Sequence, residues 1–138
     1  LRNEAATVQF IALNTTIPVP QYQLYSKDGL LHLESKRITN GVLLKGISGE
    51  FRSAAAAAVG KQINPFILPQ LRSLRRKYIG SVDPSILVFP PQRVYDRNRR
   101  PWGRISSATD CFCLCHNDLG PQNIFVCPDT FQIVRIID

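Results

Sequence analysis

The first third of the chain has apolar and polar residues in patterns that predict one helix followed by a β-hairpin. Apolar residues recur about one helical turn apart over 4–14, which is typical of an amphipathic helix. The prolines in 17–20 exclude helix there, because each one pushes the preceding residue toward extended geometry. Residues 21–25 and 30–34 have strand character, and a Lys-Asp-Gly turn at 27–29 separates them.

A long helical pattern begins at Gly49. Its apolar members lie about one turn apart, at Phe51, Ala55, Val59, Ile63, Ile67, Leu71, Leu74 and Tyr78. Because Pro65 and Pro69 interrupt it, we expect two shorter helices that meet near Asn64, with Gly80 as the stop.

The last third changes from irregular to strongly alternating. Residues 81–110 carry several prolines and arginines, and we interpret them as a loop. After this loop, 111–115 has the pattern of a strand. We expect 124–126 and 132–137 to pair as a hairpin around the turn at 128–130.

The most informative motif lies between these strands and reads Cys-His-Asn-Asp-Leu-Gly-Pro-Gln-Asn over 115–123. It contains the pattern His-x-Asp-Leu-x-x-x-Asn, and a further acid, Asp138, follows the predicted hairpin. Kinase-type phosphoryl transfer needs a carboxylate beside the acceptor hydroxyl, and an amide and a second carboxylate that hold magnesium on the nucleotide phosphates. Asp118 and Asn123 share one short loop, and a hairpin would return Asp138 to it.

Three stretches of the sequence resemble the aminoglycoside phosphotransferase group of kinase-like folds, in particular its fungal members. They cover 3–20, then 35–43, and finally 116–123 together with 136–138. Asn117 stands where protein kinases usually have arginine, and Gly120 where they have lysine, which favours this group over protein kinases. The resemblance implies an α+β, protein-kinase-like fold with incomplete small and large lobes.

The resemblance also implies roles for individual residues. Asp118 would accept or orient the proton of the acceptor hydroxyl, Asn123 and Asp138 would ligate Mg²⁺, and His116 would brace the loop. Glu4 would pair with the lysine that holds the phosphates of ATP or GTP. We retain the alternative that Glu4 is an ordinary first-turn acid, which the helix dipole favours.

Nucleotide binding would also involve the strand that joins the two lobes. The backbone around Glu34, Ser35 and Lys36 would contact adenine. By the same resemblance, 1–38 is a remnant of the small lobe and hinge, and 39–138 is a partial large lobe. The glycine-rich loop and phosphate-binding lysine would precede Glu4, so we expect this chain to have little or no kinase activity.

Composition leaves further readings open. The chain has 138 residues and a net charge of +7, which favours a polyanionic partner. A nucleic-acid-binding module built on Arg97, Arg99, Arg100 and Arg104 is the less favoured alternative, as is a non-catalytic nucleotide- or protein-binding domain. The four cysteines lack the Cys-x-x-Cys spacing of zinc sites, so we expect buried apolar roles for them. Without a long apolar run or a signal sequence, we expect no membrane span and a cytoplasmic location.

Overall fold

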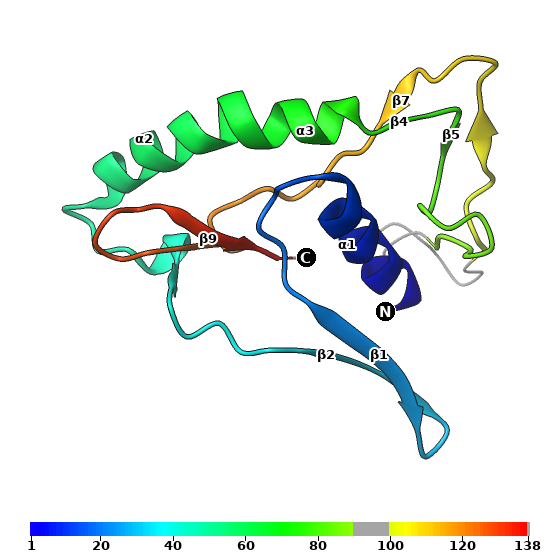
Figure 1. Ribbon diagram of the computed structural model, residues 1–138, viewed down its shortest axis with the longest axis horizontal. Helices are drawn as coiled ribbons and strands as arrows, with labels where there is room; N and C mark the ends of the chain where they lie inside the picture. The colour runs from blue at the N-terminus through cyan, green and yellow to red at the C-terminus, as the bar shows by residue number, and fades with distance from the viewer. Residues whose placement is uncertain (90–99, 138) are drawn as a thin grey trace.

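Short sheets and one long helical segment make up this mixed α+β chain. The structure, a computed structural model, describes residues 1–89 and 100–137. The elements in chain order are α1 (Arg2–Asn14), β1 (Tyr22–Lys27), β2 (Leu30–Ser35), β3 (Val42–Leu43), η1 (Leu44–Gly46), α2 (Arg52–Gln62), η2 (Ile63–Ile67), α3 (Leu68–Ser73), β4 (Arg75–Arg76), β5 (Tyr78–Ile79), β6 (Ile105–Ser106), β7 (Phe112–Cys113), β8 (Ile124–Val126) and β9 (Ile133–Ile136). Figure 1 shows their arrangement. The α+β class predicted from the sequence is therefore confirmed.

The helical segment runs without a break from α2 through η2 to α3. The turn η2 is a π-helix, in which the Leu68 N–H bonds to the Ile63 carbonyl. Pro65 and Pro69 have no N–H to give to the usual partner four residues back, and a wider turn accommodates their rings. The prolines thus widen one turn, whereas we had expected two helices to meet there.

The helix also ends earlier than its apolar spacing predicts. It stops at Ser73, and the chain continues as strands β4 and β5, which pair antiparallel with β7 and β6. The prediction that helix extends to Tyr78 and stops at Gly80 is wrong. The strand β6 likewise lies inside the segment 81–110 that we interpreted as loop.

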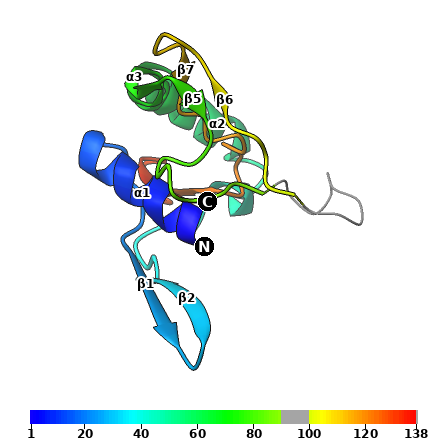
Figure 2. The ribbon, with the colours of Figure 1, turned by 90° about the vertical axis from the view of Figure 1, so that its right-hand side faces the viewer.

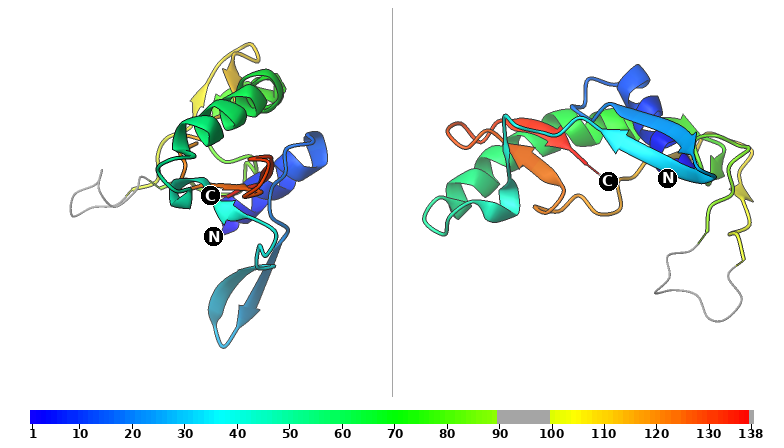
Figure 3. Two further views of the ribbon diagram at one scale, coloured as in Figure 1. Left: turned by 90° about the vertical axis from the view of Figure 1, so that its left-hand side faces the viewer. Right: turned by 90° about the horizontal axis from the view of Figure 1, so that it is seen from below.

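A three-stranded antiparallel sheet with the order β3-β8-β9 supplies one side of the core. The predicted hairpin is confirmed, with Ile124 opposite Ile136 and a bulge between Phe125 and Val126. Figure 3 shows this hairpin beside the helical segment. Ten buried residues form the core cluster, namely Ile17, Ile47, Ala55, Val59, Ile67, Leu71, Ile124, Val126, Ile133 and Ile136.

The hairpin of β1 and β2 projects from the rest of the molecule, as Figure 2 shows. Its six residue pairs run from Tyr22 opposite Ser35 to Lys27 opposite Leu30. Asp28 and Gly29 both take positive φ values, of 52° and 76°, which form the predicted turn. These two strands make a sheet of their own among the described residues.

The helices are too short or too polar to cross a lipid bilayer. This holds for every helix within residues 1–89 and 100–137.

Candidate active site

The loop that carries the kinase-type motif is anchored at both ends. At its start, β7 pairs with β4, and the Leu114 N–H bonds to the Leu74 carbonyl at 3.2 Å. At its end, Ile124 and Val126 of β8 are buried in the core. Packing at the two ends therefore fixes the position of the residues between them.

Asp118 and Asn123 are in direct contact. The Asn123 Nδ2 donates to Asp118 Oδ2 at 3.0 Å and to the Asp118 carbonyl at 2.9 Å. The Gln122 Nε2 donates to the other carboxylate oxygen, Oδ1, at 2.9 Å. Asn123 is buried and Asp118 is exposed. The carboxylate is thus oriented by two amides while it remains open to solvent, as a group that accepts a proton from an incoming hydroxyl must be.

The backbone of the loop closes tightly around this pair. The Gly120 N–H bonds to the Asp118 carbonyl at 2.8 Å, and the Asn123 N–H bonds to the Gly120 carbonyl at 2.9 Å. A Cβ atom at position 120 would overlap the end of the Gln122 side chain. Glycine therefore leaves room for the amide of Gln122 that contacts Asp118.

The end of β9 reaches the same loop. The Ile137 N–H bonds to the Asn123 carbonyl at 2.9 Å. Asp138, which the sequence predicts to be a metal ligand, lies outside the described residues. The contact of its chain neighbour, Ile137, with Asn123 supports the predicted return of the hairpin to the loop.

Asp118 and Asn123 both carry side-chain oxygens, which are the ligand atoms that magnesium prefers. Since the Nδ2 of Asn123 faces Asp118, its Oδ1 is the atom left to meet a cation. Magnesium is usually held by one or two carboxylates together with waters and substrate phosphates. Within the part of the chain that the structure describes, no group of three His, Cys, Asp or Glu side chains could hold a metal ion.

His116 and Glu4 are brought to one cavity. It has a volume of about 650 Å³, and both residues line it, as does Asn117. Glu4 belongs to the first turn of α1, so the helix predicted to carry a nucleotide-binding acid does lie beside the motif. Neither ring nitrogen of His116 has a hydrogen-bond partner among the described residues, although both are buried. The ring nitrogens thus form no hydrogen bond to the loop within the described residues.

The predicted adenine contacts, Glu34, Ser35 and Lys36, lie apart from this cavity. All three are exposed at and just beyond the end of β2. The pKa of the Tyr25 hydroxyl is raised by partial burial, and also by the charge and hydrogen bond of Glu34. The Glu34 carboxylate therefore interacts with Tyr25 within the hairpin.

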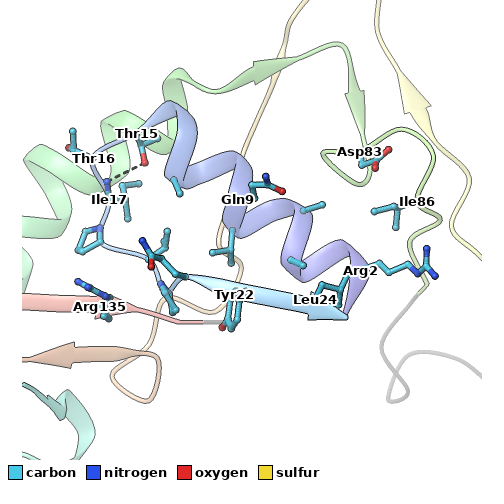
Figure 4. A pocket seen from close by; sticks show the side chains of 18 of the residues that line it. Arg2, Gln9, Thr15, Thr16, Ile17, Tyr22, Leu24, Asp83, Ile86 and Arg135 are labelled. Carbon is cyan, nitrogen blue, oxygen red and sulfur yellow. Dashed lines mark hydrogen bonds between the residues drawn. The ribbon is translucent and has the colours of Figure 1, made fainter. Parts of the chain in front are cut away.

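A second cavity, which no sequence pattern predicted, lies along α1 and the extended segment after it. Its volume is about 850 Å³, and Arg2, Tyr22, Asp83 and Arg135 are among the residues that line it. Figure 4 shows their side chains and the bond from the Ile17 N–H to the Thr15 Oγ1. Hydrogen bonds from Ser85 lower the pKa of Asp83. Charges of both signs thus line this groove.

Arg104, one of the arginines of the predicted nucleic-acid site, is bound within the molecule, whereas Arg100 is exposed. The Arg104 guanidinium lies 4.4 Å from the Tyr78 ring centroid and donates to the Pro84 carbonyl at 2.8 Å. Arg76 lies 4.6 Å from the Phe10 ring centroid. Arg97 and Arg99 lie outside the described residues. The nucleic-acid alternative gains no support from the arginine contacts that are described.

The cysteines are free thiols with differing exposure. Cys111 and Cys115 are exposed, and Cys113 and Cys127 are half-buried. The expectation that all four are buried apolar side chains is therefore wrong. Cys113 and Cys111 lie at or beside the short strand β7, whose outer position leaves thiols near solvent.

Comparison with protein-family models, curated proteins and solved structures finds no match to this chain.

Proposed function

We propose that this chain is a kinase-like phosphotransferase domain of the aminoglycoside phosphotransferase type. The reaction of this type transfers the γ-phosphoryl group of ATP or GTP to a hydroxyl of a small molecule, with Mg²⁺, and we expect it to be weak or absent in this chain by itself. The observation that carries the proposal is the contact of Asp118 with Asn123, at 3.0 Å, on a loop to which the β8–β9 hairpin returns.

Each residue has a defined task in this proposal. Asp118 accepts the proton of the acceptor hydroxyl as the new P–O bond forms. Asn123 orients Asp118 through its Nδ2 and offers its Oδ1 to the magnesium ion. Asp138 is the second magnesium ligand, and His116 supports the loop that carries Asp118. Magnesium, when bound, neutralises the charge on the phosphate oxygens.

Nucleotide contacts complete the proposed site. Glu4 is proposed to pair with the lysine that holds the nucleotide phosphates, and its position on α1 beside the start of the motif supports this. The backbone around Glu34, Ser35 and Lys36 is proposed to contact the base. Both contacts rest on the resemblance of the sequence.

The test of the catalytic role is the substitution Asp118→Asn, made in a chain completed with a glycine-rich loop and a phosphate-binding lysine. We expect phosphoryl transfer to fall by roughly 10²–10⁴-fold, the usual contribution of a general base. The affinity for ATP should remain nearly unchanged, because Asp118 is assigned to the acceptor. Transfer is measured with radiolabelled ATP and a panel of small hydroxyl compounds, and affinity by calorimetry.

A matched control is Gln122→Ala. It removes one amide from Asp118 yet keeps the carboxylate, so transfer should fall much less than in Asp118→Asn. Turnover that is the same in Asp118→Asn and in the unchanged protein would remove Asp118 from its role.

The same experiments address the alternative of a non-catalytic domain. If the protein binds ATP more tightly with Mg²⁺ than without it but transfers no phosphoryl group to any acceptor, the binding domain is the better description. Paramagnetic Mn²⁺ in place of Mg²⁺ should then broaden the NMR signal of the Asn123 side-chain amide. Equal broadening of all side-chain amides would show that the ion has no defined site.

A further inference from the structure

Cys113 and Cys115 are neighbours on the outer face of the segment that leads into the kinase-type motif. Cys113 pairs with Arg75 where β7 lies against β4 (Figure 1). The Leu114 N–H extends this pairing through its bond to the Leu74 carbonyl, and the Leu114 side chain packs against the core. Because side chains alternate along an extended chain, those of Cys113 and Cys115 both point away from the core.

The two side chains also interact with each other. The Cys115 Sγ donates to the Cys113 carbonyl at 3.8 Å, so the Cys115 side chain bends back toward Cys113. Partial burial, and then the charge and the hydrogen bonding of the Cys113 side chain, raise the pKa of the Cys115 thiol. Cys113 is half-buried and Cys115 is exposed. Both sulfur atoms are therefore within reach of one ion that arrives from solvent.

The extended backbone favours a bound ion over a disulfide at this pair. Residues two apart on a strand are separated by about 6–7 Å, twice the rise per residue, and their Cβ atoms point the same way. A disulfide needs Cβ atoms about 3.5–4.5 Å apart. An ion between the two sulfur atoms suits the wider spacing, because two metal–sulfur bonds are longer than one sulfur–sulfur bond.

We propose that Cys113 and Cys115 bind one monovalent copper ion as a pair of thiolates. Thiolates are soft ligands that select Cu⁺, and Cu⁺ is stable with two sulfur ligands in line. Zinc usually takes four ligands, and within residues 1–89 and 100–137 no group of three His, Cys, Asp or Glu side chains could hold a metal. The proposal uses neither Asp118 nor Asn123, so it stands independently of the phosphotransferase proposal.

The charge of the surroundings suits this complex. Each thiol releases its proton when it binds the metal, so two thiolates and one Cu⁺ leave a net negative charge. The positive charge of Arg72, on α3, opposes the rise in the pKa of Cys115. Arg72 is therefore placed to stabilise the anionic complex.

Titration with Cu⁺ under argon tests the site, with the ion supplied as its acetonitrile complex and bicinchoninate as the competing chelator. We expect one Cu⁺ per chain, with two sulfur neighbours in the X-ray absorption spectrum of the unchanged protein. Cys113→Ser and Cys115→Ser should each weaken binding by more than about 100-fold, since even the loss of an outer-shell partner costs about 10–100-fold. Circular dichroism checks that both variants keep the fold.

The other two cysteines provide matched controls. Cys111 lies two residues before Cys113, and Cys127 lies beyond the motif, after β8. Cys111→Ser and Cys127→Ser should bind Cu⁺ as the unchanged protein does. The proposal is overturned if Cys111→Ser weakens binding as much as Cys115→Ser, if the spectrum shows three or more sulfur neighbours, or if the unchanged protein takes no Cu⁺ from bicinchoninate.

A further pair of substitutions tests the charge of the complex. Arg72→Gln should weaken Cu⁺ binding by about twofold to fivefold, the usual value of an exposed ion pair. Arg52→Gln, at an exposed position of α2, should leave it unchanged. Tighter binding of Cu⁺ by Arg72→Gln would mean that the site repels the ion as a cation, and would overturn the assignment to two thiolates.

Discussion

The thiols of Cys127 and Cys115 have different surroundings, which shift their pKa values in opposite directions. Cys127 follows β8 in the hairpin turn, where the Thr130 hydroxyl and then the backbone N–H groups of Asp129 and Thr130 bond to its sulfur and lower its pKa. At Cys115, which is exposed as a residue, partial burial of the sulfur is the main cause of a raised pKa, and Cys113 adds to it. Hydrogen-bond donors favour the thiolate, whereas burial disfavours it.

These surroundings predict a difference in reactivity. Since the thiolate is the nucleophile, iodoacetamide should modify Cys127 faster than Cys115 near neutral pH. The difference between the two rates should become smaller as the pH rises. Peptide mass mapping of a time course measures both rates. In Thr130→Val, which removes the hydroxyl donor at similar volume, Cys127 should slow toward the rate of Cys115. If Cys115 reacts first in the unchanged protein, the assignment is wrong.

Among contacts of individual residues, the sequence predicted some and missed others. The spacing of Asp118 and Asn123 predicted one shared loop, because few residues separate them and the predicted strands flank both. The bond of Gln122 to Asp118 had no signal, since glutamine occurs on any surface. The cavity that His116 shares with α1 had no signal either, because the two segments are more than a hundred residues apart in the chain.

Among the elements, α2 is tied to the β8–β9 hairpin by one side chain. The Gln62 Oε1 accepts from the Ile133 N–H at 2.9 Å, and its Nε2 donates to the Phe131 carbonyl at 3.1 Å. Phe131 itself has a positive φ of 55°. Gln62 therefore satisfies backbone groups at the point where the chain enters β9.

The substitution Gln62→Ala should destabilise the fold by about 1–3 kcal/mol, because it leaves a partly buried N–H and a carbonyl without partners. Urea unfolding followed by circular dichroism measures the change. Gln9→Ala, at an exposed position of α1, should stay within about 0.5 kcal/mol. Equal effects of the two substitutions would contradict the bridging role.

The end of the long helical segment shows where the local spacing of apolar residues predicts the wrong structure. Leu71, Leu74 and Tyr78 continue the helical spacing, yet the chain leaves the helix after Ser73. The strands β4 and β5 find partners in β7 and β6, which lie about 30 residues later. Pairing with a distant segment cannot be read from a window of neighbouring residues.

For the whole molecule, the core joins the helical segment to the β8–β9 hairpin through a small set of aliphatic side chains. The sequence predicted this hairpin because two apolar runs flank a turn, and it predicted α1 from one amphipathic period. Both elements could be found locally, and the α+β class followed from them. The kinase-like arrangement of lobes stays a prediction.

The projecting hairpin of β1 and β2 has a consequence for the dynamics of the chain. Two strands without a third have little independent stability, and these two pair only with each other among the described residues. Their amides should exchange with deuterium far faster than those of Ile124 and Val126, whose side chains are almost fully enclosed. Mass spectrometry after brief labelling reads both regions in one sample. Equal protection would mean that the hairpin and the core open together as a single cooperative unit.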